Sequence, residues 1–351
     1  MAELTSPLKI GDFEIKNRLV LAPLTRARSG ADRIPNTLML EYYQQRANAG
    51  LLLTEATVIN PQAAGYYNTP GLWQQEQAVA WKKITDAVHA QGAKIAVQLW
   101  HVGRISDAEI IGETPVSASA VAAAGHVSLL RPKRAYATPR ALEIAEIQQI
   151  IQDYKQSAIL AQAAGFDAVE LHAANGYLVE QFLYLNSNQR DDRYGGSIEN
   201  RARFMLEVVD VLIEVWGAGR VGVHLSPRGD AHDMFDPDRL ALLSYVVEQL
   251  NQRKIAFIFA REYLAEDSLS PVLKAKFQGA WIANEKLDFD TATQLLADQQ
   301  ADAVAFGLAF IANPDLLDRY MQNASLNQVD AATLYGDTEA GYTDYPVLAD
   351  A

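Results

Sequence analysis

The sequence predicts an α/β fold, a closed (β/α)8 barrel, from three observations. Eight short apolar runs alternate with longer amphipathic segments along the 351 residues. The runs are continuously apolar, which is typical of strands that are buried on both faces of a parallel sheet. Eight strand-then-helix units are also the number that closes such a sheet into a barrel. A doubly wound open sheet is the alternative, but no GxGxxG motif opens the first helix.

The expected strands follow one another along the whole chain. They cover residues 18–23, 50–56, 94–100, 166–172, 220–226, 255–260, 280–284 and 302–307. Helical patterns lie between them, and Gly50 and Gly92 are predicted to end two of these helices. Within residues 143–165, one helical stripe is expected at Ile144, Ile147, Ile151, Tyr154 and Ala158, because these positions are spaced by three and four.

No low-complexity linker divides the chain, so we expect residues 1–351 to form a single barrel domain. Residues 101–142 are too long for a plain connection, and we expect this segment to cap the barrel mouth. Residues 1–16 are expected to form a small hairpin at the barrel bottom, turning at Gly11 and Asp12.

Composition excludes several classes of function. The formal net charge is -13, so the charge balance gives no basic footprint for nucleic acid or an anionic membrane. It contains no cysteine, which rules out disulfides, thiolate metal sites and cysteine nucleophiles. No signal peptide and no apolar run of membrane-spanning length is recognisable, so we expect a cytoplasmic protein. No stripe on an outer helix fixes the oligomeric state.

The active sites of such barrels lie at the carboxyl ends of the strands. Here the fourth expected strand ends in "LHAANGY", which contributes His172, Asn175 and Tyr177. Other strand ends contribute Pro23, Thr25, Ala56, Gln98, Trp100, His101, His224, Arg261, Lys286 and Gly307. This set could hold a planar heteroaromatic ligand by its edges. The alternative is that these polar residues only satisfy backbone groups of the loops.

Two further chemistries are less well supported by the sequence. His101, His172 and His224 resemble a catalytic zinc site, but there is no HxH on the first strand and no carboxylate clearly joins them. We therefore expect no metal. No GxSxG elbow is present. A Schiff-base lysine is not expected either, because Lys286, the lysine at a strand end, starts a loop.

Long stretches of the chain resemble the old yellow enzymes, the flavin-dependent ene-reductases related to NADH:flavin oxidoreductases and N-ethylmaleimide reductase. The matching stretches are "NRLVLAPLTRARS", "EYYQQRANAGLLLTEAT", "AVQLWHVGR", "GFDAVELHAANGYLVEQFLYLNSNQRDDRYGGSIENRARF", "ADAVAFGLAFIANPDL" and "GYTDYP". They span nearly the whole chain, in the family's order. The resemblance implies a (β/α)8 barrel that binds FMN at its mouth, takes electrons from NAD(P)H as a transient reductant and reduces a small activated alkene.

The resemblance also implies roles for individual residues. His172 and Asn175 would hydrogen-bond the activating oxygen of the substrate, and Tyr177 would donate a proton to the alkene. The implied cofactor-binding residues are Pro23, Thr25, Ala56, Gln98, His224, Lys286 and Gly307. Tyr66, Trp100 and Tyr342 would shape the substrate pocket.

Three departures from the family pattern concern the cofactor. His224 and Leu308 each stand where the family has an arginine, and Glu285 and Lys286 stand where it usually has small residues. Each change weakens the expected grip on FMN, although Lys286 could supply charge. Two hypotheses therefore remain open: an FMN-dependent ene-reductase with weakened flavin affinity, or a relative that has lost FMN and isomerises or cyclises an enone by acid/base chemistry.

Overall fold

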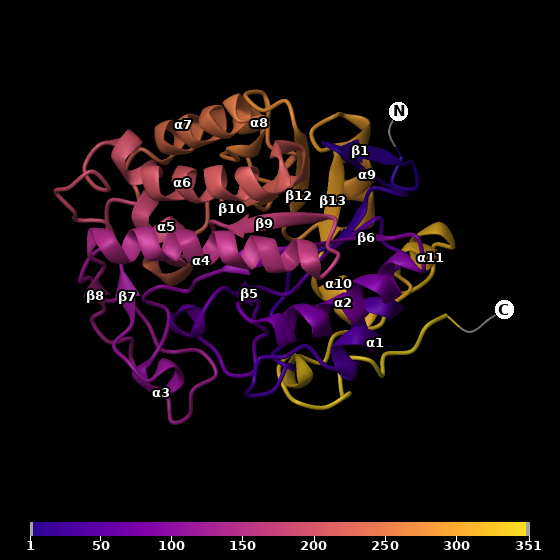
Figure 1. The fold of residues 1–351 in the computed structure, drawn as a ribbon. Coiled ribbons are helices and arrows are strands. Elements are labelled where there is room, and N and C mark those ends of the chain that lie inside the picture. The colour runs from indigo at the N-terminus through magenta and orange to yellow at the C-terminus, as the bar shows by residue number, and fades with distance from the viewer. Residues whose placement is uncertain (1–2, 349–351) are drawn as a thin grey trace.

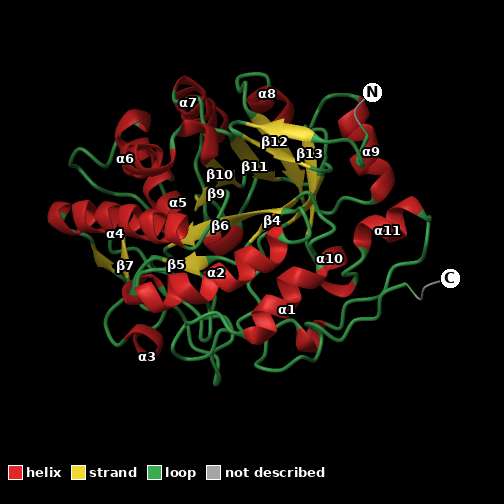
Figure 2. Cartoon of the chain, turned by 45° about the vertical axis from the view of Figure 1, so that its right-hand side comes forward, coloured by secondary structure: helices red, strands yellow, loops and turns green. Residues whose placement is uncertain are grey.

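A computed structural model describes residues 3–348. Eight parallel strands form a closed barrel, and Figures 1 and 2 show the arrangement of strands and helices. Each strand pairs in parallel with the next, and the last pairs with the first. The strands are β3 (Leu19–Leu21), β4 (Leu51–Leu53), β6 (Lys94–Trp100), β9 (Ala168–His172), β10 (Val221–Leu225), β11 (Phe257–Arg261), β12 (Ala280–Asn284) and β13 (Ala303–Phe306). All eight expected strands are present, and the predicted fold class is confirmed.

Helices surround the barrel. The longer ones are α1 (Thr37–Gln45), α2 (Gln75–His89), α4 (Ile144–Ala163), α6 (Ile198–Trp216), α7 (Arg239–Gln252) and α9 (Phe289–Ala297). Short ones are α3 (Ala108–Ile111), α5 (Leu178–Leu183), α8 (Ser270–Lys274), α10 (Leu308–Ala312) and α11 (Leu316–Met321). None of the helices within residues 3–348 combines the length and the apolar character needed to cross a bilayer.

Helix α4 shows how the pattern of apolar residues sets the packing. Ile147, Ile151, Tyr154 and Ala158 are all buried, as the stripe predicted. Ile144 is 42% exposed and lies outside the stripe, because it is the first residue of the helix. Burial of such side chains contributes roughly 1.5–3 kcal/mol each, so this face holds the helix against its neighbours.

The bottom of the barrel is closed by an antiparallel hairpin of β1 (Leu8–Ile10) and β2 (Phe13–Ile15), as expected. Ile10, Phe13 and Ile15 belong to the apolar cluster that fills the barrel interior. The turn needs glycine at position 11, since φ is +52° and a Cβ there would lie 2.2 Å from the carbonyl oxygen of Gly219. The carboxyl ends of the strands therefore form the open end.

The segment 101–142 contains α3 and two short strands, β7 (Val116–Ser117) and β8 (Arg140–Ala141), which pair in parallel. A further bridge joins His126 to Ala135. Residues between these two positions line the cavity at the open end of the barrel.

Candidate active site

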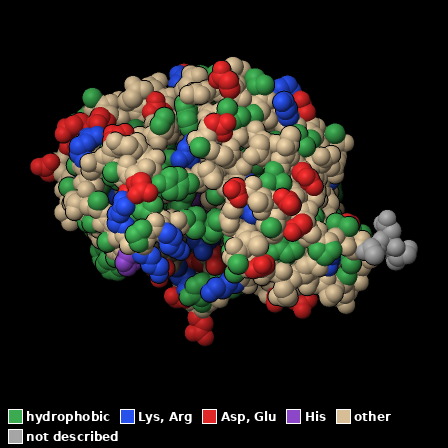
Figure 3. Space-filling model, turned by 90° about the horizontal axis from the view of Figure 1, so that it is seen from below, with side chains coloured by type: hydrophobic (Ala, Val, Ile, Leu, Met, Phe, Trp, Pro, Cys, Tyr) green, Lys and Arg blue, Asp and Glu red, His purple; other side chains and the backbone are tan. Residues whose placement is uncertain are grey.

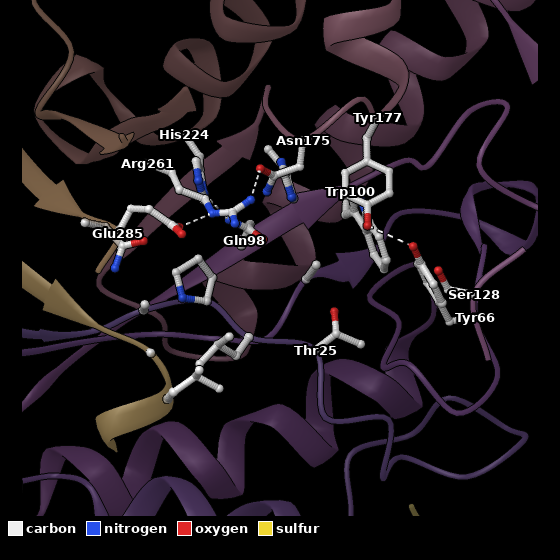
Figure 4. Close-up of a pocket in the computed structure, with 18 of the residues that line it drawn as sticks. Thr25, Tyr66, Gln98, Trp100, Ser128, Asn175, Tyr177, His224, Arg261 and Glu285 are labelled. Carbon is white, nitrogen blue, oxygen red and sulfur yellow. Dashed lines mark hydrogen bonds and ion pairs between the residues drawn. The ribbon is translucent and has the colours of Figure 1, made fainter. Parts of the chain in front are cut away.

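One cavity of about 940 Å³ opens at the carboxyl ends of the strands (Figure 4). Twelve of the thirteen site residues predicted from the sequence line it: Pro23, Thr25, Ala56, Tyr66, Gln98, Trp100, His172, Asn175, Tyr177, His224, Lys286 and Gly307. The face seen in Figure 3 is hollowed, and Lys and Arg side chains gather beside the hollow. Cations from the capping segment and from strand ends are among the lining residues, namely Arg131, Lys133, Arg261 and Lys286.

A strand end, a left-handed turn and a helix start together produce the spacing of His172, Asn175 and Tyr177. Strand β9 ends at His172, and Tyr177 precedes the first residue of α5. Between them, Asn175 has φ +58° and Gly176 has φ +79°. Asparagine tolerates this region better than most residues. At Gly176 a Cβ would lie 2.7 Å from the carbonyl oxygen of Ala231. The sharp reversal directs all three side chains to the cavity.

The Tyr177 hydroxyl lies 3.0 Å from the Tyr66 hydroxyl. The Trp100 ring packs against both: it stacks on Tyr66 at 5.6 Å and meets Tyr177 edge-on at 4.9 Å. Burial raises the pKa of Tyr177 above its ordinary value, and the hydrogen bond from Tyr66 opposes that shift. The phenol therefore stays protonated at neutral pH and is able to act as an acid.

Strand register brings two imidazoles together. His172 on β9 and His224 on β10 are register partners, and their rings stack at 5.0 Å with an interplanar angle of 7°. Burial lowers the pKa of His172 to about 3, and it lowers the pKa of His224 well below its ordinary value. Both rings are neutral at physiological pH, so each has one N–H to donate.

The strand register also explains the polar contacts of Gln98 with Glu170 and His224. Gln98 on β6 faces Glu170 on β9, and Gln98 Nε2 donates to Glu170 Oε2 at 2.7 Å and contacts His224 Nδ1 at 2.9 Å. Burial raises the pKa of Glu170 to about 8. The 4.0 Å approach of Glu170 to His224 is therefore no ion pair, because burial favours the neutral form of both groups.

Arg261 has a position in the site that the sequence did not reveal. From the end of β11, its Nη1 donates to Asn175 Oδ1 at 2.7 Å and its Nε donates to Glu285 Oε2 at 2.6 Å (Figure 4). From the sequence, Arg261 is expected only at a strand end. Side chains two residues apart on a strand point to the same side, so Arg261 is expected to share the side of Phe259. In the structure both residues line the cavity.

The turn after β12 keeps a backbone that suits glycine although its side chains are large. Glu285 has φ +101° and Lys286 has φ +53°, a region that costs of order 1 kcal/mol or more for a residue with a Cβ. The Lys286 ammonium lies 5.1 Å from the centre of the Tyr263 ring. Leu308, the first residue of α10, lines the cavity and is 56% exposed.

The expectation for Tyr342 was wrong, because this residue does not line the cavity. Its ring is buried and stacks on Tyr42 at 4.2 Å. The guanidinium groups of Arg26 and Arg28 lie 5.0 and 4.4 Å from the ring centre. Tyr335 from the same C-terminal segment lines the cavity instead.

The three histidines considered as zinc ligands do not form a metal site. Within residues 3–348, no group of three His, Cys, Asp or Glu side chains could hold a metal ion. His101 is buried, does not line the cavity, and accepts a hydrogen bond from the Gly103 backbone N–H at 3.1 Å through Nδ1.

Residues 3–327 match the sequence model of the NADH:flavin oxidoreductase / NADH oxidase family. The chain belongs to this family, the old yellow enzymes. 12-Oxophytodienoate reductase 1 of Oryza sativa subsp. japonica is 44% identical over 360 residues, which cover 98% of this chain and 93% of that protein. A probable flavin mononucleotide-dependent alkene reductase of Leishmania infantum is 40% identical, with 98% and 97% covered.

Solved structures of old yellow enzymes agree with the fold and the assignment. Morphinone reductase in complex with tetrahydroNAD has 45% identity and a TM-score of 0.95, covering 100% of this chain and 99% of that one. The old yellow enzyme homologue of Zymomonas mobilis has 39% identity and a TM-score of 0.96, covering 99% and 100%. The chain is thus an enzyme of a flavin oxidoreductase family, and these likenesses favour the ene-reductase over the non-redox alternative.

The cavity residues fit the ring of FMN. His172 Nδ1 and His224 Nε2 are buried and have no hydrogen-bond partner among the described residues. Such atoms are rare in folded proteins, and a ligand with polar edges would satisfy them. The negative charge of Glu285 is paired with Arg261, so it does not face an anionic ligand unopposed.

Proposed function

We propose that this protein is an FMN-dependent ene-reductase that uses NAD(P)H to reduce activated C=C bonds in enones, nitroalkenes or maleimides. The supporting observation is the convergence of three groups on one cavity: the neutral imidazole of His172, the amide of Asn175 and the protonated phenol of Tyr177. The relatives include reductases named for 12-oxophytodienoate and morphinone, which supports a small alkene substrate.

His172 and Asn175 would polarise the substrate. Negative charge builds on the activating oxygen when the β-carbon accepts a hydride, and donors already in place stabilise that charge without reorganising. Because burial keeps His172 neutral, its ring acts as a hydrogen-bond donor, and the proton stays on the enzyme. The stacking of His224 on His172 holds the ring in this orientation.

Tyr177 would complete the reaction by donating its proton to the α-carbon. Its hydroxyl is within hydrogen-bond distance of Tyr66, which can stabilise the phenolate that proton transfer leaves behind. When bound, FMN supplies the hydride. Thr25, Gln98 and His224 would hold its ring, and Pro23, Ala56, Lys286 and Gly307, also on the cavity wall, would contact the cofactor.

We also propose that FMN is held less tightly than in relatives with arginines at positions 224 and 308. His224 is neutral, and Leu308 has neither charge nor donor. A hydrogen bond to a charged group contributes about 1.5–3 kcal/mol, so each loss weakens binding roughly ten- to a hundredfold.

The single-domain organisation, with residues 101–142 as a cap, is part of the same proposal. Ser128, Leu129, Arg131 and Lys133 from this segment line the cavity beside the strand ends. Replacing all four by glycine should weaken alkene binding while the thermal midpoint changes little.

Product analysis tests the proposed activity. The protein is incubated with FMN, NADPH or NADH, and 2-cyclohexenone under nitrogen, and the products are separated by gas chromatography. We expect cyclohexanone in amounts equal to the reductant consumed. Isomerised or cyclised enone formed without reductant would support the non-redox alternative, and no product from an enone, a nitroalkene or a maleimide would refute the proposal.

A further inference from the structure

Arg261 joins two parts of the cavity wall. Its Nη1 donates to Asn175 Oδ1 at 2.7 Å, and its Nε donates to Glu285 Oε2 at 2.6 Å (Figure 4). The side chain of Glu285 is only 23% exposed, so the Nε side of the guanidinium is held by a largely buried carboxylate. A planar guanidinium held at two points has little freedom to turn.

The contact with Arg261 decides which end of the Asn175 amide faces the cavity. A guanidinium carries donors only, so the atom of Asn175 that meets it has to be the acceptor Oδ1. The Nδ2 group is then directed away from Arg261. Among residues 3–348, Nδ2 of Asn175 has no hydrogen-bond acceptor, and the residue lines the cavity. Asn175 therefore offers a donor to a ligand in the cavity.

The rest of Asn175 is already fixed by its backbone. Its N–H donates to Ser226 Oγ at 3.1 Å, and its carbonyl oxygen lies 2.8 Å from His232 Nδ1. The amide orientation is the remaining freedom of this residue. If the amide turned over, Oδ1 would face the substrate oxygen, and two acceptors would repel each other where a donor is needed.

We propose that Arg261 is a positioning residue that holds the Asn175 amide with Nδ2 toward the activating oxygen of the substrate. The inference rests on the proposed function, since it assigns Asn175 a ligand with an acceptor oxygen. Arg261 acts through Asn175 and does not take part in proton or hydride transfer.

A double-mutant cycle tests this coupling. Arg261→Met removes every donor at similar length, and Asn175→Ala removes the amide. We expect Arg261→Met to lower kcat/KM for 2-cyclohexenone about tenfold or more. In the Asn175→Ala background the same change should have an effect of less than about twofold. Arg261→Lys should restore part of the activity, because it keeps a donor without the fork.

Arg228→Met is the matched control. Arg228 binds Glu262 and Asp267 and does not line the active-site cavity. Glu262 keeps its contacts with the backbone N–H groups of Leu269 and Ser270 in this variant. This variant should turn over the enone at the wild-type rate. Thermal midpoints of all variants confirm that they fold.

A second readout does not need turnover. In protein without cofactor, labelled with ¹⁵N at asparagine, the Nδ2 resonances assigned through Asn175→Ala should shift in Arg261→Met and stay unchanged in Arg228→Met. Unmoved resonances would overturn the proposal, as would equal loss of kcat/KM in both backgrounds. If the wild type reduces no alkene, the proposed function fails, while the resonances still decide the contact between Arg261 and Asn175.

Discussion

Replacing Tyr177 by phenylalanine removes the proposed proton donor and leaves the ring in place. Loss of a general acid slows a step by about 10²–10⁴-fold, which is roughly 2.7–5.4 kcal/mol. The variant also loses the hydrogen bond to Tyr66, 3.0 Å away. A lost neutral hydrogen bond accounts for only about 0.5–1.5 kcal/mol. A slowing of more than a hundredfold therefore reports the missing proton and not the missing contact.

Stopped-flow absorbance separates the two half-reactions. Reduction of the FMN-loaded protein by NADPH should proceed in Tyr177→Phe at a rate within about threefold of the wild type, because no proton from the phenol is needed there. Reoxidation by 2-cyclohexenone should slow by at least about a hundredfold. Tyr66→Phe is the matched control: it breaks the same hydrogen bond but keeps the donor, so reoxidation should slow about tenfold or less. Equal slowing of both half-reactions in Tyr177→Phe would refute the proton-donor role.

The remaining predictions concern the cofactor, stability and pH. Leu308→Arg should tighten FMN binding about ten- to a hundredfold in a fluorescence titration. Leu308→Met should leave the affinity unchanged, and an unchanged affinity in both variants would contradict the proposal that Leu308 weakens FMN binding. Burial raises the pKa of Glu170 from 4.5 to about 8, so stability present at low pH is lost as pH rises between these values. The free energy of unfolding of Glu170→Gln minus that of the wild type should therefore be larger at pH 8.5 than at pH 5, by more than about 1.4 kcal/mol in urea titrations. The same difference at both pH values would contradict this. Because the pKa of His172 is lowered to about 3, kcat/KM for the alkene should show no histidine ionisation between pH 5.5 and 8; a midpoint near 6.5 that disappears in His172→Asn would contradict the neutral-donor role.

The barrel and much of its cavity follow from local features of the chain. Strands such as 94–100 and 168–172 are mostly apolar without strict alternation, and their alternation with helices favours a parallel sheet. The triad of His172, Asn175 and Tyr177 needs only a strand end, a left-handed turn and a helix start, all within six residues. Such short-range features are visible in a single sequence.

Contacts between distant segments were not predictable in the same way. The bond from Arg261 to Asn175 joins strand ends separated by β10 and depends on side-chain direction. Tyr342 was misplaced for a similar reason. Arg26 and Arg28 bind backbone carbonyls of the C-terminal segment, including those of Gly341 and Ala340, and this draws Tyr342 against Tyr42 and away from the cavity.

Gly50 is needed for close backbone packing and not for ending a helix. It was expected to end a helix, but α1 ends at Gln45. Gly50 instead allows β3 and β4 to approach, since a Cβ there would lie 2.0 Å from the carbonyl oxygen of Asn17. Its N–H donates to the Leu19 carbonyl oxygen at 3.0 Å. A close backbone approach leaves no periodic signal in the sequence.

The most direct test of the central claim is an anaerobic visible spectrum of the purified protein titrated with FMN. We expect a bound flavin band that bleaches with NADPH or NADH and returns in full when 2-cyclohexenone is added. A flavin spectrum that stays identical to that of free FMN, or a bleached band that the enone does not restore, would contradict it.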